Sequence, residues 1–140
     1  MVKAISFNIK VPIYVEVGVR KKRKYYSNLN IYRNLPFHLS NSLKKEMKLI
    51  IAGVVPKEYL GINIQNYELT YTLYLPNKLR RDIANVCSIV DKQTADALVE
   101  LDVLEDDNYL HLKKVTYLYG GYDDNKKGYV NVHVQEVLDG

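Results

Sequence analysis

Residues 80–108 read RRDIANVCSIVDKQTADALVELDVLEDDN, and this stretch decides the fold. Apolar residues recur in it at three- and four-residue spacing, which predicts a helix from Ile83 to Leu101 with one apolar stripe. The polar run from Glu105 to Asn108 then predicts a turn. The predicted stripe consists of Val86, Ile89, Val90, Ala97, Leu98 and Leu101.

The segments on either side predict further strands and one more helix. Alternating apolar residues predict a strand or hairpin arm over residues 2–17 and a strand from Tyr67 to Leu75. Residues 20–34, basic at first and then rich in tyrosine and asparagine, are interpreted as an extended surface segment. A helix is predicted from about Phe37 to Ala52, with Gly53 as its stop and a loop over 54–66. Strands at Leu110–Tyr119 and Tyr129–Val137 are predicted to flank a flexible hairpin tip at Gly120–Gly128. This order predicts an α+β fold, a mixed β-sheet with two main helices packed on one face.

Length and composition favour one soluble domain over residues 1–140. The single cysteine, Cys87, excludes an internal disulfide and is expected to be a small buried residue. No apolar run reaches the roughly 20 residues that span a bilayer. The N-terminus also lacks a signal-peptide core. We therefore expect a cytoplasmic protein with no membrane partner.

Charge is divided unevenly along the chain. Residues 1–57 carry 12 lysines and arginines against 2 aspartates and glutamates, whereas residues 58–140 carry 8 against 14. A basic half can grip a polyanion while an acidic half holds cations. The same division also fits head-to-tail self-association.

Acidic residues recur along the predicted helix behind two arginines, Arg80 and Arg81. Aspartates gathered in this way suit a divalent metal, and arginines beside them suit a phosphate. The pattern therefore points to metal-dependent cleavage of a nucleic-acid backbone. On a helical wheel Asn85, Lys92 and Asp96 share one sector, and Asp91 lies on the opposite flank of the apolar stripe.

Each acidic residue also has an ordinary structural explanation. Asp82 is a good N-cap residue for the predicted helix. Lys92 and Asp96 have the i,i+4 spacing of a surface ion pair. Asp106, Asp107 and Asn108 have the composition of a turn.

Taken in order, these residues resemble a known family. The pattern Arg81-Asp82-x-x-Asn85…Asp91-Lys92-x-x-x-Asp96-Ala97-Leu98…Asp106-Asp107 resembles the core signature of the RusA family of Holliday junction resolvases, above all its phage-borne members. The segment Tyr26-x-Asn28-Leu29-Asn30-x-Tyr32-Arg33-Asn34 resembles the N-terminal motif of those phage members. The likeness covers about residues 20–110 and the strand that follows.

The resemblance implies a RusA-like fold and a homodimeric endonuclease that resolves four-way DNA junctions by paired symmetric nicks. It implies Mg²⁺, with Mn²⁺ as a substitute, in the cytoplasm of a bacterial or phage-infected cell, serving DNA recombination and repair. The implied metal ligands are Asp82, Asp91, Asp106 and Asp107. The implied catalytic residues are Asp82, Asp91, Lys92 and Asp107.

One position departs from the family pattern. The second acid at the helix start is replaced by Ala84, and about one extra helical turn separates Asn85 from Lys92. Asp91 would then supply the missing carboxylate. The alternative is a catalytically weak or inactive branched-DNA-binding protein of the same fold.

A run of five cations precedes the Tyr- and Asn-rich segment. Lysine and arginine neutralise phosphates, while tyrosine and asparagine contact the backbone or stack on unpaired bases. The alternatives are a solvated hairpin tip or, since the chain has 13 tyrosines, a protein-interaction module with no role on DNA. The predicted DNA-binding residues are Arg20, Lys21, Lys22, Arg23, Lys24, Tyr26, Asn28, Asn30, Tyr32, Arg33, Arg80 and Arg81.

Overall fold

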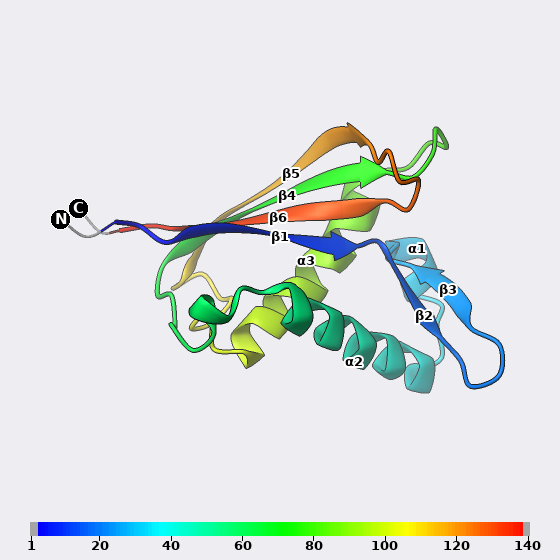
Figure 1. Cartoon of the computed structure of the whole chain (residues 1–140), viewed down its shortest axis with the longest axis horizontal. Coiled ribbons are helices and arrows are strands. Elements are labelled where there is room, and N and C mark those ends of the chain that lie inside the picture. The colour runs from blue at the N-terminus through cyan, green and yellow to red at the C-terminus, as the bar shows by residue number, and fades with distance from the viewer. Residues whose placement is uncertain (1–2, 139–140) are drawn as a thin grey trace.

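The computed structural model describes residues 3–138 and shows a mixed α+β fold, as predicted (Figure 1). A four-stranded sheet forms one layer, and the two long helices lie together on one of its faces. The elements in chain order are β1 (Ser6–Pro12), β2 (Tyr14–Val17), β3 (Arg23–Tyr26), α1 (Leu29–Tyr32), α2 (Phe37–Val54), η1 (Lys57–Tyr59), β4 (Tyr67–Leu75), α3 (Ile83–Glu100), β5 (Leu112–Tyr122) and β6 (Tyr129–Glu136).

The sheet has the strand order β1-β6-β4-β5. Strands β4 and β5 are parallel, and α3 provides the crossover that two parallel strands require. The other pairings in this sheet are antiparallel. The predicted hairpin around Gly120–Gly128 is therefore wrong, because β4 lies between β5 and β6. Strand β6 buries Val130, Val132 and Val134 and lies inside the sheet, whereas no residue of β5 is buried and β5 forms an edge.

Several other elements also differ from their predicted bounds. The segment over residues 20–34 is not uniformly extended, since it contains β3 and the short helix α1. Asn28 caps α1, because its Oδ1 accepts a 2.9 Å hydrogen bond from the Asn30 amide. Helix α2 continues through Gly53 and ends at Val54, two residues before Pro56, which has no amide hydrogen to continue the helix. The predicted N-terminal arm is two strands, β1 and β2, separated at Ile13, and Val2 lies outside the described residues.

The core forms between the helices and one face of the sheet. Along β4 every second residue is buried, among them Tyr67 and Tyr71, and the intervening residues are half-buried on the uncovered face. Cys87 of α3 is fully buried, as predicted. The residues with which α2 reaches this core are Leu43, Met47 and Ile51.

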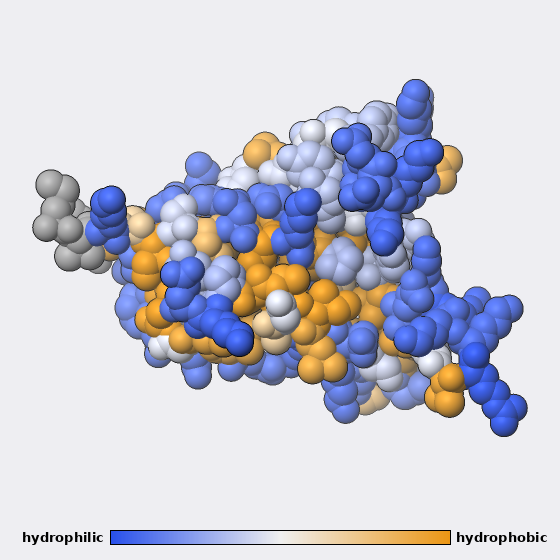
Figure 2. All heavy atoms as spheres, in the orientation of Figure 1, coloured by the Kyte–Doolittle hydropathy of each residue, from blue (hydrophilic) through white to orange (hydrophobic). Residues whose placement is uncertain are grey.

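The polar loops gather at one end of the molecule. The β2–β3 hairpin, α1, the β4–α3 loop and the β5–β6 connection all lie at the end away from the two termini (Figure 1). Figure 2 shows strongly hydrophilic projections at this end and apolar atoms nearer the middle of the same view. No helix among residues 3–138 is long and apolar enough to cross a membrane.

Candidate nucleic-acid interface

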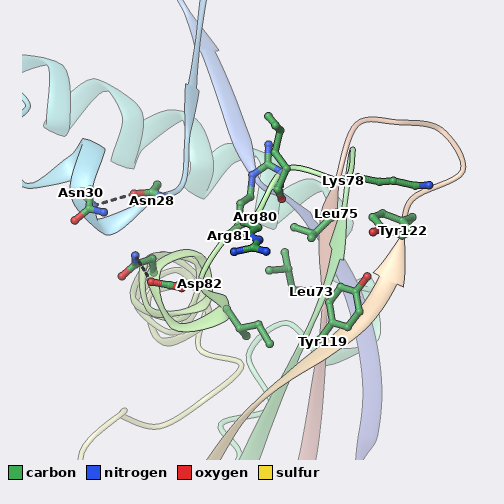
Figure 3. A pocket seen from close by; sticks show the side chains of 13 residues that line it. Asn28, Asn30, Leu73, Leu75, Lys78, Arg80, Arg81, Asp82, Tyr119 and Tyr122 are labelled. Carbon is green, nitrogen blue, oxygen red and sulfur yellow. Dashed lines mark hydrogen bonds between the residues drawn. The ribbon is translucent and has the colours of Figure 1, made fainter.

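A cleft of about 680 Å³ opens beside the N-terminal end of α3 (Figure 3). Besides β4, three separate stretches line it: Asn28 and Asn30 before and in α1, residues 78–83 with Asn85 around the helix start, and the end of β5. The cleft thus brings Asn28 and Asn30 of the 26–34 motif beside the beginning of the 81–107 motif, whose residues from Asp91 onward do not line it. Leu73 and Leu75 of β4 form its floor.

Three cations line this cleft: Lys78, Arg80 and Arg81. Arg81 Nη1 donates a 2.8 Å hydrogen bond to Asn77 Oδ1, which holds its guanidinium in place. Figure 3 shows this guanidinium pointing into the space between α3 and β5. Guanidinium groups held in this way suit the oxygens of a phosphate, and the positive end of the α3 dipole faces the same side.

Asp82 lies in the same cleft, at the N-cap of α3. Its position agrees with the N-cap interpretation, but its side chain makes no capping hydrogen bond. Within the described residues its one side-chain hydrogen bond is a 3.3 Å bond that Asn85 Nδ2 donates to Oδ2. The carboxylate is thus exposed and retains acceptor capacity for a cation or a water molecule.

Asp91 has a different environment, on the side of α3 that faces the sheet. Its Oδ1 accepts a 2.7 Å hydrogen bond from the Tyr71 hydroxyl, and its Oδ2 accepts one of 2.9 Å from the Tyr117 hydroxyl. Burial, followed by the Asp91 charge, raises the pKa of Tyr71. Burial and the hydrogen bond to Asp91 likewise raise the pKa of Tyr117. Both tyrosines therefore stay protonated and serve as donors to this carboxylate.

Asp106 and Asp107 lie in the polar turn beyond the C-terminal end of α3. Asp106 accepts hydrogen bonds from the Asp107 amide at 2.7 Å and from Asn108 Nδ2 at 3.1 Å, so its turn role is confirmed. Burial, the Asp106 side chain and the Asp96 charge raise the pKa of Asp107. Like charges crowded in this way are relieved by a bound cation. The hydroxyl of Tyr67 donates a 2.6 Å hydrogen bond to the backbone carbonyl of Asp106.

The predicted metal ligands are not brought together in one cluster. Asp82 precedes Asp91 by nine residues, which is about 13 Å along the helix axis and half a turn around it. Among residues 3–138, no three His, Cys, Asp or Glu side chains are placed to hold a metal jointly. Mg²⁺ requires only one or two protein carboxylates when waters and substrate phosphates complete its shell. The donor chemistry therefore fits Mg²⁺ only as part of a complex with DNA.

Lys92 and Asp96 line a second cavity of about 370 Å³, together with Arg33 and Lys44. This confirms that Lys92 and Asp96 share one side of the helix. Within residues 3–138 they form no ion pair with each other; the ion pair on this part of α3 joins Lys48 to Glu100. Lys92 lies about 15 Å along the axis from Asp82, so the structure does not bring these two predicted catalytic residues together.

Tyr32 lies beside this second cavity and is half-buried. Its hydroxyl accepts a 2.9 Å hydrogen bond from Gln93 Nε2. Burial raises the pKa of Tyr32, although the hydrogen bonds from Gln93 and Ser27 oppose this. Tyr32 therefore joins α1 to α3 and offers only part of its ring to a ligand.

The cations from Arg20 to Lys24 occupy the tip of the β2–β3 hairpin and its first β3 residues, and all are exposed. Lys24 lies over the ring of Tyr14 at 4.8 Å from its centroid. Tyr26 is half-buried and packs against Tyr14 with ring centroids 5.5 Å apart. The hairpin therefore offers a dense set of charges, while Tyr26 serves mainly as packing beneath them.

The sequence prediction missed three residues of the cleft: Lys78, Tyr119 and Tyr122. The two tyrosines flank the pair Gly120-Gly121, which was interpreted as a hairpin tip. Two adjacent glycines within an otherwise β-rich stretch also indicate a β-bulge, and that signal would have kept Tyr122 in the strand. A search of protein-family models and a search of curated proteins returned no match to this chain.

Proposed function

We propose that the protein is a Mg²⁺-dependent, structure-selective endonuclease that resolves four-way DNA junctions by paired symmetric nicks. One observation carries the proposal: Asp82, with no capping bond, shares a cleft with three cations, and that cleft joins both stretches that resemble the RusA family. A carboxylate next to phosphate-binding cations is the arrangement that phosphodiester hydrolysis needs.

Different residues of the chain would bind the DNA, orient the scissile phosphate and hold the metal. The hairpin cations and Arg33 grip the DNA backbone, and Arg80 and Arg81 orient the scissile phosphate. Mg²⁺, with Asp82 as its proposed protein ligand and with waters and DNA phosphate oxygens completing its shell, would supply charge neutralisation and an acidified water. Hydrolysis then adds water across the P–O3′ bond and leaves a 5′-phosphate and a 3′-hydroxyl.

Lys92 lines the second cavity, about 15 Å along the helix axis from Asp82, and is therefore proposed to neutralise a neighbouring phosphate of the DNA backbone. A homodimer with two-fold symmetry would place two equivalent sites against the two opposed strands of a junction. Junction selection would rest on shape and backbone contacts more than on base reading.

The direct test compares cleavage of a labelled four-way junction with cleavage of a linear duplex of matched sequence, each in Mg²⁺ and in EDTA. We expect paired nicks in the junction alone, only in Mg²⁺, and at least a hundredfold slower in Asp82→Asn. Asp102→Asn is the matched control, because Asp102 is exposed just beyond α3 at a positive φ of 55°, a conformation that asparagine accepts. Equal cleavage by Asp82→Asn and the control would exclude Asp82 from the site.

A second function is favoured by a specific observation. Ala84 occupies the place of an acid, and Asp91 is already bonded to two tyrosine hydroxyls. A chain of this kind could bind branched DNA without cutting it. Tight, salt-sensitive junction binding with no product in Mg²⁺ or Mn²⁺ would establish this alternative. Absence of any salt-dependent DNA affinity would contradict both functions.

A further inference from the structure

Tyr119 and Tyr122 lie on one face of β5 although their positions differ by three, an odd number. In an unbroken strand an odd spacing places two side chains on opposite faces. Here the register shifts: Leu73 pairs with Tyr119, Tyr74 with Gly121 and Leu75 with Tyr122. Leu73 and Leu75 are both buried on the helix-facing side, so their partners Tyr119 and Tyr122 also project to that side.

The register shift depends on the two glycines between the tyrosines. Gly121 has a positive φ of 125°, which side chains other than hydrogen rarely allow. At Gly120 a Cβ atom would lie 2.6 Å from Cζ of Tyr74. The local sequence Tyr-Gly-Gly-Tyr therefore builds a bulge that turns the second tyrosine into the cleft.

Both rings remain accessible in the cleft. Tyr119 is 50% exposed and Tyr122 is 51% exposed, and neither forms an aromatic pair within residues 3–138. Figure 3 shows both tyrosines on one wall of the cleft, Asp82 and Asn28 on the other, and the Arg81 guanidinium between them. Two half-exposed tyrosine rings thus lie beside three cations in one cleft.

The groups around this space match the parts of one nucleotide. Tyrosine rings offer flat faces to a base, Lys78, Arg80 and Arg81 offer charge to its phosphate, and the Asn28 and Asn30 amides offer hydrogen bonds to base or sugar edges. The volume of about 680 Å³ falls in the range of small-ligand pockets, about 300–1,000 Å³.

We propose that this cleft holds one unpaired nucleotide of a DNA strand, with its base stacked on Tyr119 or Tyr122 and its phosphate on the adjacent arginines. This inference rests on the proposed function in one respect: it takes the polymer to be branched DNA, whose branch point provides bases without a stacked neighbour. The tyrosine wall then gives the protein a way to prefer branch points over continuous duplex.

The test measures binding in EDTA, where no cleavage intervenes. The probes are fluorescein-labelled oligo(dT)₁₂ and a 12-base-pair duplex, titrated with wild type, Tyr119→Ala, Tyr122→Ala and the double variant. We expect the double variant to bind oligo(dT)₁₂ roughly 5- to 150-fold more weakly, as loss of a base stack predicts, with less than a twofold change for the duplex. The Tyr→Phe variants keep the ring and should bind like wild type.

Two control substitutions remove exposed side chains that lie outside the cleft, one from a tyrosine and one from a leucine of β5. Tyr109 is 83% exposed and precedes β5, at the end of that strand away from the cleft, so Tyr109→Ala should leave binding unchanged. Leu118 lies on the opposite face of β5, paired with Thr72, so Leu118→Ala should also have no effect. A loss equal to that of the double variant in either control would overturn the inference, as would unchanged binding by the double variant.

A free nucleotide carries the same base, sugar and phosphate and is the alternative ligand for this cleft. Competition by dTMP at concentrations similar to those of oligo(dT)₁₂ would overturn the assignment to a DNA strand. The inference and the proposed function fail separately. If the protein binds four-way junctions equally well with and without the two tyrosine side chains, the nucleotide pocket is wrong and the proposed function is unaffected. If binding of oligo(dT)₁₂ depends on the tyrosines but the protein has no affinity for junctions, the proposed function is wrong and the nucleotide pocket is unaffected.

Discussion

The hydroxyl of Tyr71 donates a 2.7 Å hydrogen bond to Oδ1 of Asp91 and thereby joins the middle of β4 to the middle of α3. Tyr71 is fully buried and Asp91 is half-buried, so little water is present to replace this bond. Tyr117 of β5 donates to the other carboxylate oxygen at 2.9 Å. One acid therefore fixes the helix against two parallel strands.

Removing one donor should destabilise the fold measurably. Tyr71→Phe leaves the Asp91 oxygen without a buried partner, and we expect the free energy of unfolding in urea to fall by about 1–3 kcal/mol. Tyr109→Phe removes an exposed hydroxyl and should change it by less than about 0.5 kcal/mol. Equal effects of the two substitutions would mean that water replaces the bond.

The same tyrosine should make the fold sensitive to alkali. The pKa of Tyr71 is raised in the fold, so the folded protein keeps this proton while the unfolded chain releases it above pH 10. Stability from this group is complete below pH 10 and declines above it, by about 1.4 kcal/mol per pH unit. Urea unfolding at pH 8 and pH 11 should show a smaller loss for Tyr71→Phe than for wild type, and an identical loss would contradict the assignment.

Cys87 should resist thiol reagents. Burial, followed by the Asp91 charge, raises the pKa of Cys87 to about 12, so at pH 8 roughly one thiol in ten thousand is ionised. We expect Ellman's reagent to react with native protein only over hours and with protein in 6 M guanidinium within seconds. Rapid reaction of the native protein would show that α3 opens readily from the sheet.

Local patterns predicted the elements well where periodicity was strong. The bounds of β4 agree with the prediction, and α3 ends one residue earlier than predicted, because apolar residues there repeat with one clear period. Strand order was the main failure. The alternation in a run such as 110–119 predicts a strand, but it does not predict which strand pairs with it. In the structure β5 pairs with β4 at the edge of the sheet and β6 lies inside it.

Part of the candidate site could also be predicted from the sequence and part could not. The sequence predicted Arg80, Arg81, Asp82 and Asn28 as functional residues, and the structure places all four in one cleft. Spacing along a helix did not reveal that Asp91 would be bonded to tyrosines of two strands, because that contact depends on strand pairing. Tyr122 was missed for a related reason, since its direction depends on a register shift.

The hairpin cations should determine how DNA affinity depends on salt. Each phosphate that the protein no longer neutralises reduces the slope of log affinity against log salt by roughly 0.9, so replacing Arg20, Lys21 and Lys22 by alanine should reduce it by up to about 2.7. These residues are exposed, so the fold should be retained. The control is Lys57→Ala in η1, distant from the hairpin, and titrations of a four-way junction from 50 to 200 mM salt give the slopes. An unchanged slope in the triple variant would assign the hairpin to a surface that does not bind DNA.

Two glycine-to-alanine substitutions should change the free energy of unfolding in opposite directions. At Gly120 the added Cβ would lie 2.6 Å from Tyr74 Cζ and 2.7 Å from Thr72 Cγ2. Tyr74 cannot move freely, because its ring stacks on Tyr129 with centroids 4.7 Å apart. We therefore expect Gly120→Ala to destabilise the protein by about 1–3 kcal/mol in urea unfolding.

At Gly53, inside α2, an added Cβ has no atom within 4 Å. Alanine there lowers the entropy of the unfolded chain and suits the helix, so Gly53→Ala should stabilise by about 0.5–1 kcal/mol. If Gly120→Ala is as stable as wild type, the close approach of Gly120 to Tyr74 is not what holds the bulge. If only Gly120→Ala also loses binding to oligo(dT)₁₂, the bulge itself directs Tyr122 into the cleft.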